Sequence, residues 1–171
     1  MDRRLFVLRH AKSSWDDPAL ADHDRPLNDR GRDSLPKLQR ALTEHTHAID
    51  VVLCSSAART VATFDGVRGA LREDVEVVVE EELYGASAST WLARCRELDD
   101  GAGGALLVGH NPGLEDLIVE LTGAGEQDAL EQLASKVPTG ALACCSFDGS
   151  WSSLGEDSCY LDALLIPKRL P

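Results

Sequence analysis

The sequence predicts an α/β protein, a three-layer α/β/α sandwich in which a mostly parallel (mixed) sheet lies between two layers of helices. Short apolar runs alternate with helix-like segments along the chain, which is typical of a mostly parallel sheet. The last two apolar runs are joined by a Gly- and Ser-rich turn at residues 148–150, so they can pair antiparallel. The 171 residues, 43% hydrophobic and 27% charged, suit one globular domain spanning residues 1–171.

Six apolar runs are expected to form the strands. The second of them is rich in β-branched residues, which favour an extended backbone. Aromatic residues make up only 5% of the chain, so the core must be built from Val, Leu, Ile and Ala. The predicted strands span residues 5–8, 51–54, 75–79, 105–108, 141–147 and 160–166.

Five segments between these runs are expected to be helical. The first carries Leu35, Leu38 and Leu42 on one face, and the third has Ser or Thr residues that can cap it ahead of Trp91 and Leu92. The predicted helices span residues 31–46, 57–71, 89–98, 114–121 and 128–134.

The charge of the chain excludes one class of function and constrains another. Seventeen basic and 29 acidic residues give a net charge of -12. Proteins that bind DNA or RNA through the backbone usually carry the opposite sign, so we expect no nucleic-acid partner. An acidic surface also repels small anions, so an enzyme of this charge that acts on phosphate needs a concentrated basic pocket.

The cysteines and the apolar runs indicate the compartment. Five cysteines, an odd number without a C-x-x-C pair, are expected to be free core residues in a reducing environment. The apolar run after the first four residues is too short for a signal peptide, and no run approaches the roughly 18 residues of a membrane span. We therefore expect a cytoplasmic protein with no membrane partner.

Polar residues interrupt the chain where four predicted strands end. The first strand ends at Arg9 and His10, the second leads to Arg59, the third ends in residues 80–82, and the fourth is followed by His110. In open α/β sheets, ligands bind at the carboxyl ends of the strands. Taken singly, each residue is more often structural or solvent-exposed than functional. Their joint placement predicts one basic pocket.

Two guanidiniums and two imidazoles suit a phosphoryl group. An arginine is always charged and can bind two phosphate oxygens at once. A neutral imidazole beside it can attack phosphorus and form a phosphohistidine, which divides one difficult displacement into two easier ones. Nearby positive charge should lower both histidine pKa values. None of the five histidines has metalloprotease spacing, and we expect neither a metal nor a cofactor.

The same residues resemble a known family. Residues 5–15, LFVLRHAKSSW, resemble the opening of the histidine phosphatase superfamily, which has the phosphoglycerate mutase-like fold, and "RHAKSSW" is similar to its small SixA-type phosphohistidine phosphatases. Three further stretches resemble family motifs in the family's order. They are DRPLNDRG at residues 24–31, SSAART at residues 55–60 and LVGHNPG at residues 107–113.

The resemblance implies a role for each matching residue. His10 is implied as the nucleophile, Arg9 and Arg59 as ligands of the phosphoryl oxygens, and His110 as a further ligand that stabilises the transition state. Arg25 is a weaker candidate for substrate contact. In larger relatives an acidic residue protonates the leaving group; Glu82 stands at that place, with Glu81 as its competitor or no acid at all as the third possibility.

The chain also departs from the family pattern. Larger members carry insertions that cover the pocket, and this chain has little room for one, which implies an open, shallow site and argues against mutase activity. Ala11 replaces the usual Gly after the motif histidine, and Ala57 replaces a frequent Pro. Both changes are expected to be tolerated.

Three functions remain open on the sequence. The first is a metal-independent phosphatase that removes phosphate from protein phosphohistidine through His10. The second is a small-molecule phosphomonoesterase with the same mechanism, because the motifs address only the phosphoryl group. The third is a non-catalytic phosphate-binding module, which would not need both His10 and His110.

Overall fold

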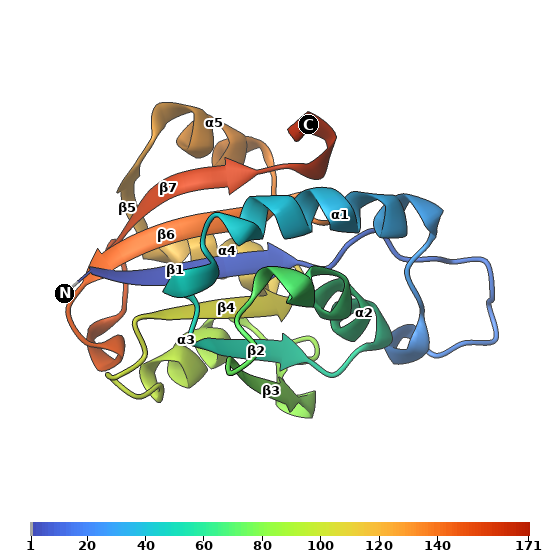
Figure 1. The fold of residues 1–171 in the computed structure, drawn as a ribbon, viewed down its shortest axis with the longest axis horizontal. Coiled ribbons are helices and arrows are strands. Elements are labelled where there is room, and N and C mark those ends of the chain that lie inside the picture. Colours follow the sequence, from blue (N-terminus) through green and yellow to red (C-terminus); the bar gives the residue numbers. More distant parts are fainter. Residues whose placement is uncertain (1) are drawn as a thin grey trace.

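The fold is a three-layer α/β/α sandwich with a seven-stranded mixed sheet, as predicted (Figure 1). The structure is a computed structural model that describes residues 2–171, the side chain of Thr46 excepted. The strands are β1 (Asp2–Arg9), β2 (Val51–Ser55), β3 (Glu76–Glu80), β4 (Gly104–Gly109), β5 (Thr122–Gly125), β6 (Leu142–Asp148) and β7 (Cys159–Leu165). The helices are α1 (Asp29–Thr43), α2 (Ala58–Val67), α3 (Ala88–Arg96), α4 (Gly113–Leu121) and α5 (Gln127–Ser135).

The sheet has a parallel part and an antiparallel part. Its order is β3-β2-β4-β1-β6-β7-β5, and β3, β2, β4 and β1 all pair in parallel. β6 pairs antiparallel with both β1 and β7, which confirms the predicted mixed sheet. The carboxyl ends of β1, β2 and β4 therefore lie along one edge.

One strand was not predicted. β5 pairs in parallel with β7 at the end of the sheet, and its sequence is Thr-Gly-Ala-Gly. Small residues without apolar alternation carry no strand signal, and half of this segment is solvent-exposed. The position of the segment beside β7 gives it its extended conformation.

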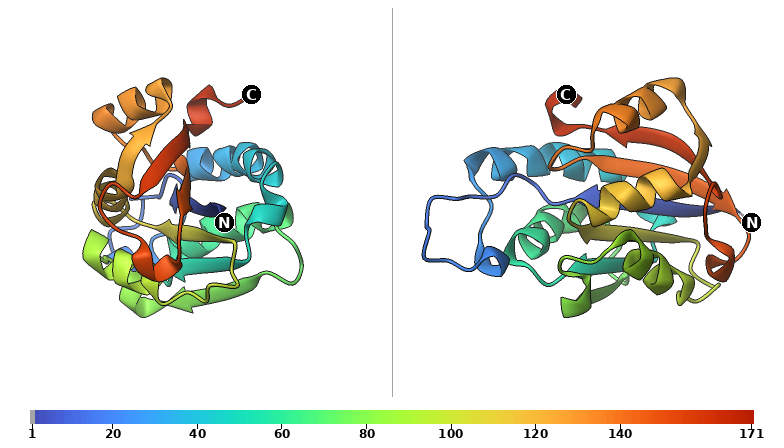
Figure 2. Two further views of the ribbon diagram at one scale, coloured as in Figure 1. Left: turned by 90° about the vertical axis from the view of Figure 1, so that its left-hand side faces the viewer. Right: turned by 180° about the vertical axis from the view of Figure 1, so that it is seen from behind.

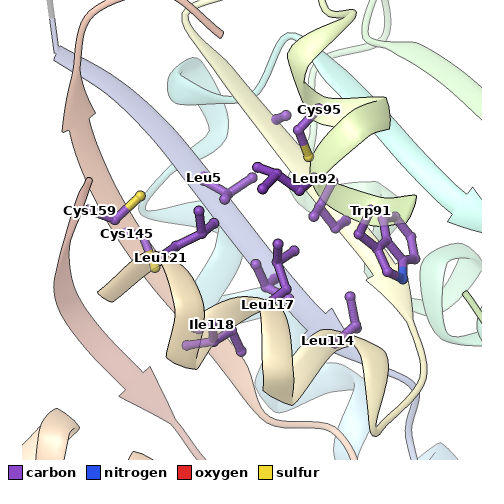
Figure 3. Close-up of a cluster of buried hydrophobic side chains, with 14 of the residues drawn as sticks. Leu5, Trp91, Leu92, Cys95, Leu114, Leu117, Ile118, Leu121, Cys145 and Cys159 are labelled. Atoms are coloured by element: carbon purple, nitrogen blue, oxygen red, sulfur yellow. The ribbon is translucent and has the colours of Figure 1, made fainter. Parts of the chain in front are cut away.

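Alternate residues of the strands pack into two hydrophobic clusters, one on each face of the sheet. Phe6 and Leu8 of β1 point toward α1 and α2, together with Leu38 and Phe64. Helices α3, α4 and α5 cover the opposite face of the sheet (Figures 1 and 2), and the residues of β1 on that face belong to the second cluster. Figure 3 shows this second cluster, in which Leu5 lies among Trp91, Leu92, Leu114, Leu117 and Leu121.

All five cysteines are free and buried, so their predicted core role is confirmed. Burial raises the pKa of Cys54, Cys95 and Cys144 to about 12, which keeps these thiols protonated. Across residues 2–171 no helix is both long enough and apolar enough to span a membrane.

Candidate active site

The register of the parallel strands brings the two histidines together. Arg9 of β1 pairs with Gly109 of β4, so His10 and His110 follow these neighbouring strands at the same level. The backbone N–H of His10 donates to the carbonyl of Gly109 at 3.0 Å, and the two imidazole centroids are 5.3 Å apart. This contact is the geometry on which the sequence hypothesis depended.

His10 is held in one tautomer. Its Nδ1 lies 2.7 Å from the carbonyl oxygen of Ala11, and a carbonyl can only accept, so Nδ1 carries the proton. The lone pair is therefore on Nε2. Burial lowers the pKa of His10 to about 4, and the charges of Arg59, Arg9 and Arg25 act in the same direction. His10 is thus a neutral imidazole at neutral pH, with a nucleophilic nitrogen.

His110 is fixed by a serine at the end of β2. Its Nε2 lies 2.7 Å from Ser55 Oγ, and both side chains are buried. Ser55 Oγ also accepts from the N–H of Ala57 at 3.4 Å, so its own hydrogen can be donated to Nε2. When Ser55 donates to Nε2 in this way, the His110 proton sits on Nδ1. Burial, followed by the charge of Arg59, lowers the pKa of His110 to about 3.

Two arginines converge on the acidic residue Asp22. The guanidinium of Arg59, in the first turn of α2, donates to the Asp22 carbonyl at 2.7 Å and to Oδ2 at 3.1 Å. Arg25 donates from Nε to Asp22 Oδ1 at 3.1 Å and from its terminal nitrogen to Ser13 Oγ at 2.8 Å. Its guanidinium also stacks 3.5 Å from the ring centroid of Trp15.

Arg9, the last residue of β1, precedes His10 and is held by the segment before β6. It donates to the carbonyl of Val137 at 2.9 Å, and burial lowers its guanidinium pKa. Together with Arg59 and Arg25 it lowers the pKa of His10, so all three guanidiniums act on the nucleophilic imidazole.

Three buried nitrogen atoms of these side chains have no hydrogen-bond partner within the described part of the chain. They are Nε of Arg9, Nε of Arg59 and Nδ1 of His110. Buried polar groups are nearly always paired, so an unpaired donor needs an explanation. A tetrahedral anion beside His10 would accept from donors of this kind.

Asp22, Tyr84 and Ser55 belong to the site, although the sequence reasoning gave them no role. The Tyr84 hydroxyl donates to Asp22 Oδ2, and its ring centroid lies 5.5 Å from that of His110. This hydrogen bond, followed by those from the arginines, holds the pKa of Asp22 well below its usual range, so the carboxylate stays ionised. No pattern distinguishes Asp22 among 29 acidic residues.

The site is recessed beneath the segment that connects β1 to α1. Asp22 of that segment reaches Arg59 and Tyr84, and His10, Arg59 and His110 are each only 5–7% exposed. The reacting side chains are therefore far less exposed than the expected shallow site would suggest.

Glu82 does not join this group. It is solvent-exposed, and no hydrogen bond or ion pair within residues 2–171 connects it to His10, Arg59 or His110. It lines a separate cleft of about 300 Å³ with Glu80, Arg94 and Glu97. Glu81 is also exposed. The structure brings Arg9, His10, Arg25, Arg59 and His110 together and leaves both glutamates outside.

The two departures from the family pattern fit the local backbone. Ala57 immediately precedes α2 with φ -62°, an angle that proline also adopts, so alanine is compatible with the same turn. Ala11 is not among the described residues with positive φ, so its side chain causes no backbone strain. Gly31 is required for another reason, because a Cβ there would clash with the carbonyl oxygen of Lys12.

Comparison with known proteins connects this geometry to a family. The model of the histidine phosphatase superfamily (branch 1) matches residues 5–101. The uncharacterized protein ML1117 of Mycobacterium leprae is 32% identical over 167 residues, which cover 94% of this chain and 100% of that protein. These matches cover the strands and helices that carry His10 and Arg59.

Solved structures agree over nearly the whole chain. A candidate phosphohistidine phosphatase SixA from Nakamurella multipartitia is 29% identical with a TM-score of 0.83, covering 98% of this chain and 97% of that one. A second SixA candidate, from Agrobacterium tumefaciens, is 28% identical with a TM-score of 0.80 and covers 96% and 98%. The phosphoglycerate mutase-like fold, the ordered motifs and the paired histidines agree, and the chain belongs to the histidine phosphatase superfamily.

Proposed function

We propose that this phosphatase removes the phosphoryl group from protein phosphohistidine through a covalent intermediate on His10. The observation that carries the proposal is the free lone pair on Nε2 of His10, 5.3 Å from His110 between ring centroids, in a site where buried nitrogens of Arg9, Arg59 and His110 have no partner among the described residues. A nucleophile and a set of oxyanion donors are the two parts that phosphoryl transfer requires.

The reaction takes two steps. In the first, the Nε2 lone pair attacks phosphorus, the bond from phosphorus to the leaving nitrogen breaks, and the phosphoryl group becomes bonded to His10. In the second, water attacks phosphorus, its proton passes to solvent, and the bond to Nε2 breaks to release inorganic phosphate. The guanidiniums of Arg9 and Arg59 neutralise the phosphoryl oxygens in both steps, so the proposal requires no metal ion.

Within the described residues no protonated carboxyl group lies beside His10, which supports a nitrogen leaving group. Asp22 is ionised and Glu82 is exposed, and within the described residues no other carboxyl group contacts the paired histidines. When an alkyl phosphate is cleaved, the departing alkoxide needs a proton. When a phosphohistidine is cleaved, the leaving group is an imidazole that can already carry a proton on its other nitrogen. The likeness to SixA candidates at 28–29% identity supports the same substrate class. A small phosphate ester with a good leaving group is the alternative substrate.

A comparison of leaving groups tests the substrate class. The value of kcat/KM should be high for a phosphohistidine peptide, measurable for an aryl phosphate, and at least about a hundredfold lower for an alkyl phosphate such as phosphoserine. Equal kcat/KM values for the alkyl and aryl phosphates would show that an acid acts after all, and the Glu82→Gln and Glu81→Gln variants would then identify it.

The covalent step has its own test. Enzyme quenched during turnover should carry covalently bound phosphate that survives alkali and is lost in acid. The His10→Ala variant should carry no such phosphate. EDTA should leave the rate unchanged. Full turnover by His10→Ala would refute the mechanism. A native protein that binds phosphate but hydrolyses no substrate would be a non-catalytic module.

We further propose that residues 1–171 act as one catalytic domain, because one continuous seven-stranded sheet runs through the molecule and the site lies at the carboxyl ends of its parallel strands. Met1 lies outside the described residues. The five free, buried cysteines fit a reducing compartment such as the cytoplasm.

A further inference from the structure

A second cleft is lined by Arg9 but by neither of the paired histidines. Its volume is about 530 Å³, within the range of small-molecule sites. It lies between the start of α1, the segment before β6 and the C-terminal segment, which runs beside α1 in Figure 1. Its lining residues include Lys12, Arg30, Lys136, Lys168 and Arg169 in addition to Arg9.

This cleft is basic in an acidic protein. Six of its twelve lining residues are Lys or Arg, and none is Asp or Glu. The chain as a whole carries 29 acidic against 17 basic residues, so more than a third of its cations lie around one cleft. A random placement on this surface would mix the two signs. The cleft is therefore a local region of positive potential.

Five of these cations are unpaired. Within residues 2–171, the side chains of Lys12, Arg30, Lys136, Lys168 and Arg169 form no hydrogen bond or ion pair, and all five are exposed. Arginines elsewhere, such as Arg3, Arg72 and Arg94, pair with carboxylates. Like charges gathered without counter-charges repel one another, and a bound anion would remove that repulsion.

The cleft and the phosphoryl site share one residue, Arg9. Arg9 lines the cleft and also lowers the pKa of His10. The segment that carries Lys136 is tied to the same strand end, because the N–H of Gly140 donates to the carbonyl of His10 at 2.9 Å and Arg9 donates to Val137. These backbone contacts place the segment of Lys136 beside the strand end that carries Arg9 and His10, so an anion in the cleft would lie next to the phosphoryl site.

We propose that this basic cleft is an anion subsite that binds a second anionic group of the substrate, either a further phosphate or a cluster of carboxylates. The inference rests on the proposed function, because Arg9 must face the phosphoryl group. It explains how an acidic enzyme attracts an acidic substrate, and it makes substrates with one isolated phosphoryl group poor relative to those with a neighbouring anion.

The test compares a double variant in the cleft with a double variant outside it that makes the same change in net charge. Lys136→Gln/Lys168→Gln removes two cleft charges without touching the reacting side chains. Arg4→Gln/Arg68→Gln removes two charges near the start of β1 and after the end of α2, at the opposite edge of the sheet. Each protein is assayed with an aryl phosphate and with phosphohistidine peptides flanked by glutamate or by alanine, and binding of inorganic tripolyphosphate and orthophosphate is measured by calorimetry.

We expect the cleft variant to hydrolyse the aryl phosphate and the alanine-flanked peptide within about twofold of the native rate. Two preferences are compared with those of the native protein: the binding of tripolyphosphate over orthophosphate, and the hydrolysis of the glutamate-flanked peptide over the alanine-flanked one. At least one of them should fall about tenfold or more, because charge-assisted contacts are lost. Loss with the peptide alone identifies a protein carboxylate as the second anion, and loss with tripolyphosphate alone identifies a phosphate.

Unchanged preferences for both probes, or an equal loss in Arg4→Gln/Arg68→Gln, would overturn the subsite. Tripolyphosphate binding needs no turnover and can be measured on His10→Ala. A native enzyme that binds tripolyphosphate through the cleft yet hydrolyses nothing would therefore refute the proposed function and leave the subsite standing.

Discussion

His10 combines a neutral imidazole with a place among positively charged groups, and the two properties support each other. A nucleophilic imidazole must be neutral, and positive charge around it disfavours the imidazolium form. Burial and the guanidiniums lower its pKa to about 4, while the Ala11 carbonyl fixes the proton on Nδ1. The same cations that bind the phosphoryl group therefore keep the nucleophile unprotonated before substrate arrives.

The acid limb of catalysis should reflect this shift. Above about pH 4 the free enzyme holds His10 neutral, so kcat/KM for an aryl phosphate should stay high through pH 6.5 and fall only as the pH approaches 4. The measurement is a kcat/KM profile from pH 3.5 to 8, with the ionisation of the substrate titrated separately and divided out. A limb centred near 6.5 would mean that His10 has the pKa of an exposed histidine.

Ser55 acts through His110. Removing its hydroxyl leaves the buried Nε2 without a partner and releases the proton from Nδ1, the nitrogen that faces no protein acceptor. Ser55→Ala should lower kcat at least about tenfold with a smaller change in KM, and it should lower the free energy of unfolding by about 1–3 kcal/mol.

The matched control is the neighbouring serine. Ser56→Ala makes the same chemical change one residue away, where the hydroxyl contacts His23 and not His110. It should leave kcat within about twofold. If both variants lost kcat equally, the orientation of His110 would not depend on Ser55.

At the scale of elements, the parallel strands were the predictable part of the molecule. Apolar runs that end in Arg9-His10 and in Gly109-His110 define both the strands and the catalytic edge, because the carboxyl ends of parallel strands share one side. β5 could not be predicted, since its small residues form a strand only beside β7. Asp22 and Tyr84 were missed for a similar reason, because their contacts depend on how two loops fold over the site.

Asn28, which precedes α1, both caps this helix and holds the chain segment that follows His10. Asn28 caps this helix by accepting from the N–H of Gly31 at 2.9 Å, and its own N–H donates to the carbonyl of Lys12 at 3.0 Å. Asn28→Ala removes the side-chain cap and should lower the free energy of unfolding by about 1 kcal/mol in urea titration. Asn28→Ser keeps a capping oxygen and should retain most of that stability. Equal losses in the two variants would show that the cap contributes nothing.

At the scale of the whole molecule, the distribution of charge matters more than its sum. With a net charge of -12, the molecule as a whole repels a phosphate ion. The arginines of the site and the cations of the basic cleft nevertheless gather at one edge of the sheet. The sequence predicted that a basic pocket was needed and located Arg9 and Arg59 in it. It could not locate Lys136 or Lys168, because only the folded chain brings them beside β1.

The two buried histidines also couple folding to pH. Their folded pKa values, about 4 for His10 and about 3 for His110, lie below the 6.5 of an unfolded histidine. Above pH 6.5 neither state binds these protons and stability is unaffected. As the pH falls below 6.5, the unfolded chain takes up protons that the folded chain refuses, so the free energy of unfolding falls by up to about 1.4 kcal/mol per pH unit for each histidine.

Protonation of the many carboxylates changes stability over the same pH range, so the effect of one histidine must be isolated by difference. His10→Gln removes one of the two buried sites, and the free energy of unfolding of this variant should fall less steeply than that of the native protein between pH 6.5 and 4.5. His47→Gln makes the same substitution at an exposed position and should follow the native curve. Urea titrations at half-unit pH steps measure all three proteins. If the curves of His10→Gln and the native protein ran parallel, the imidazole of His10 would be protonated in the folded state, and the nucleophile would lack its lone pair at mildly acidic pH.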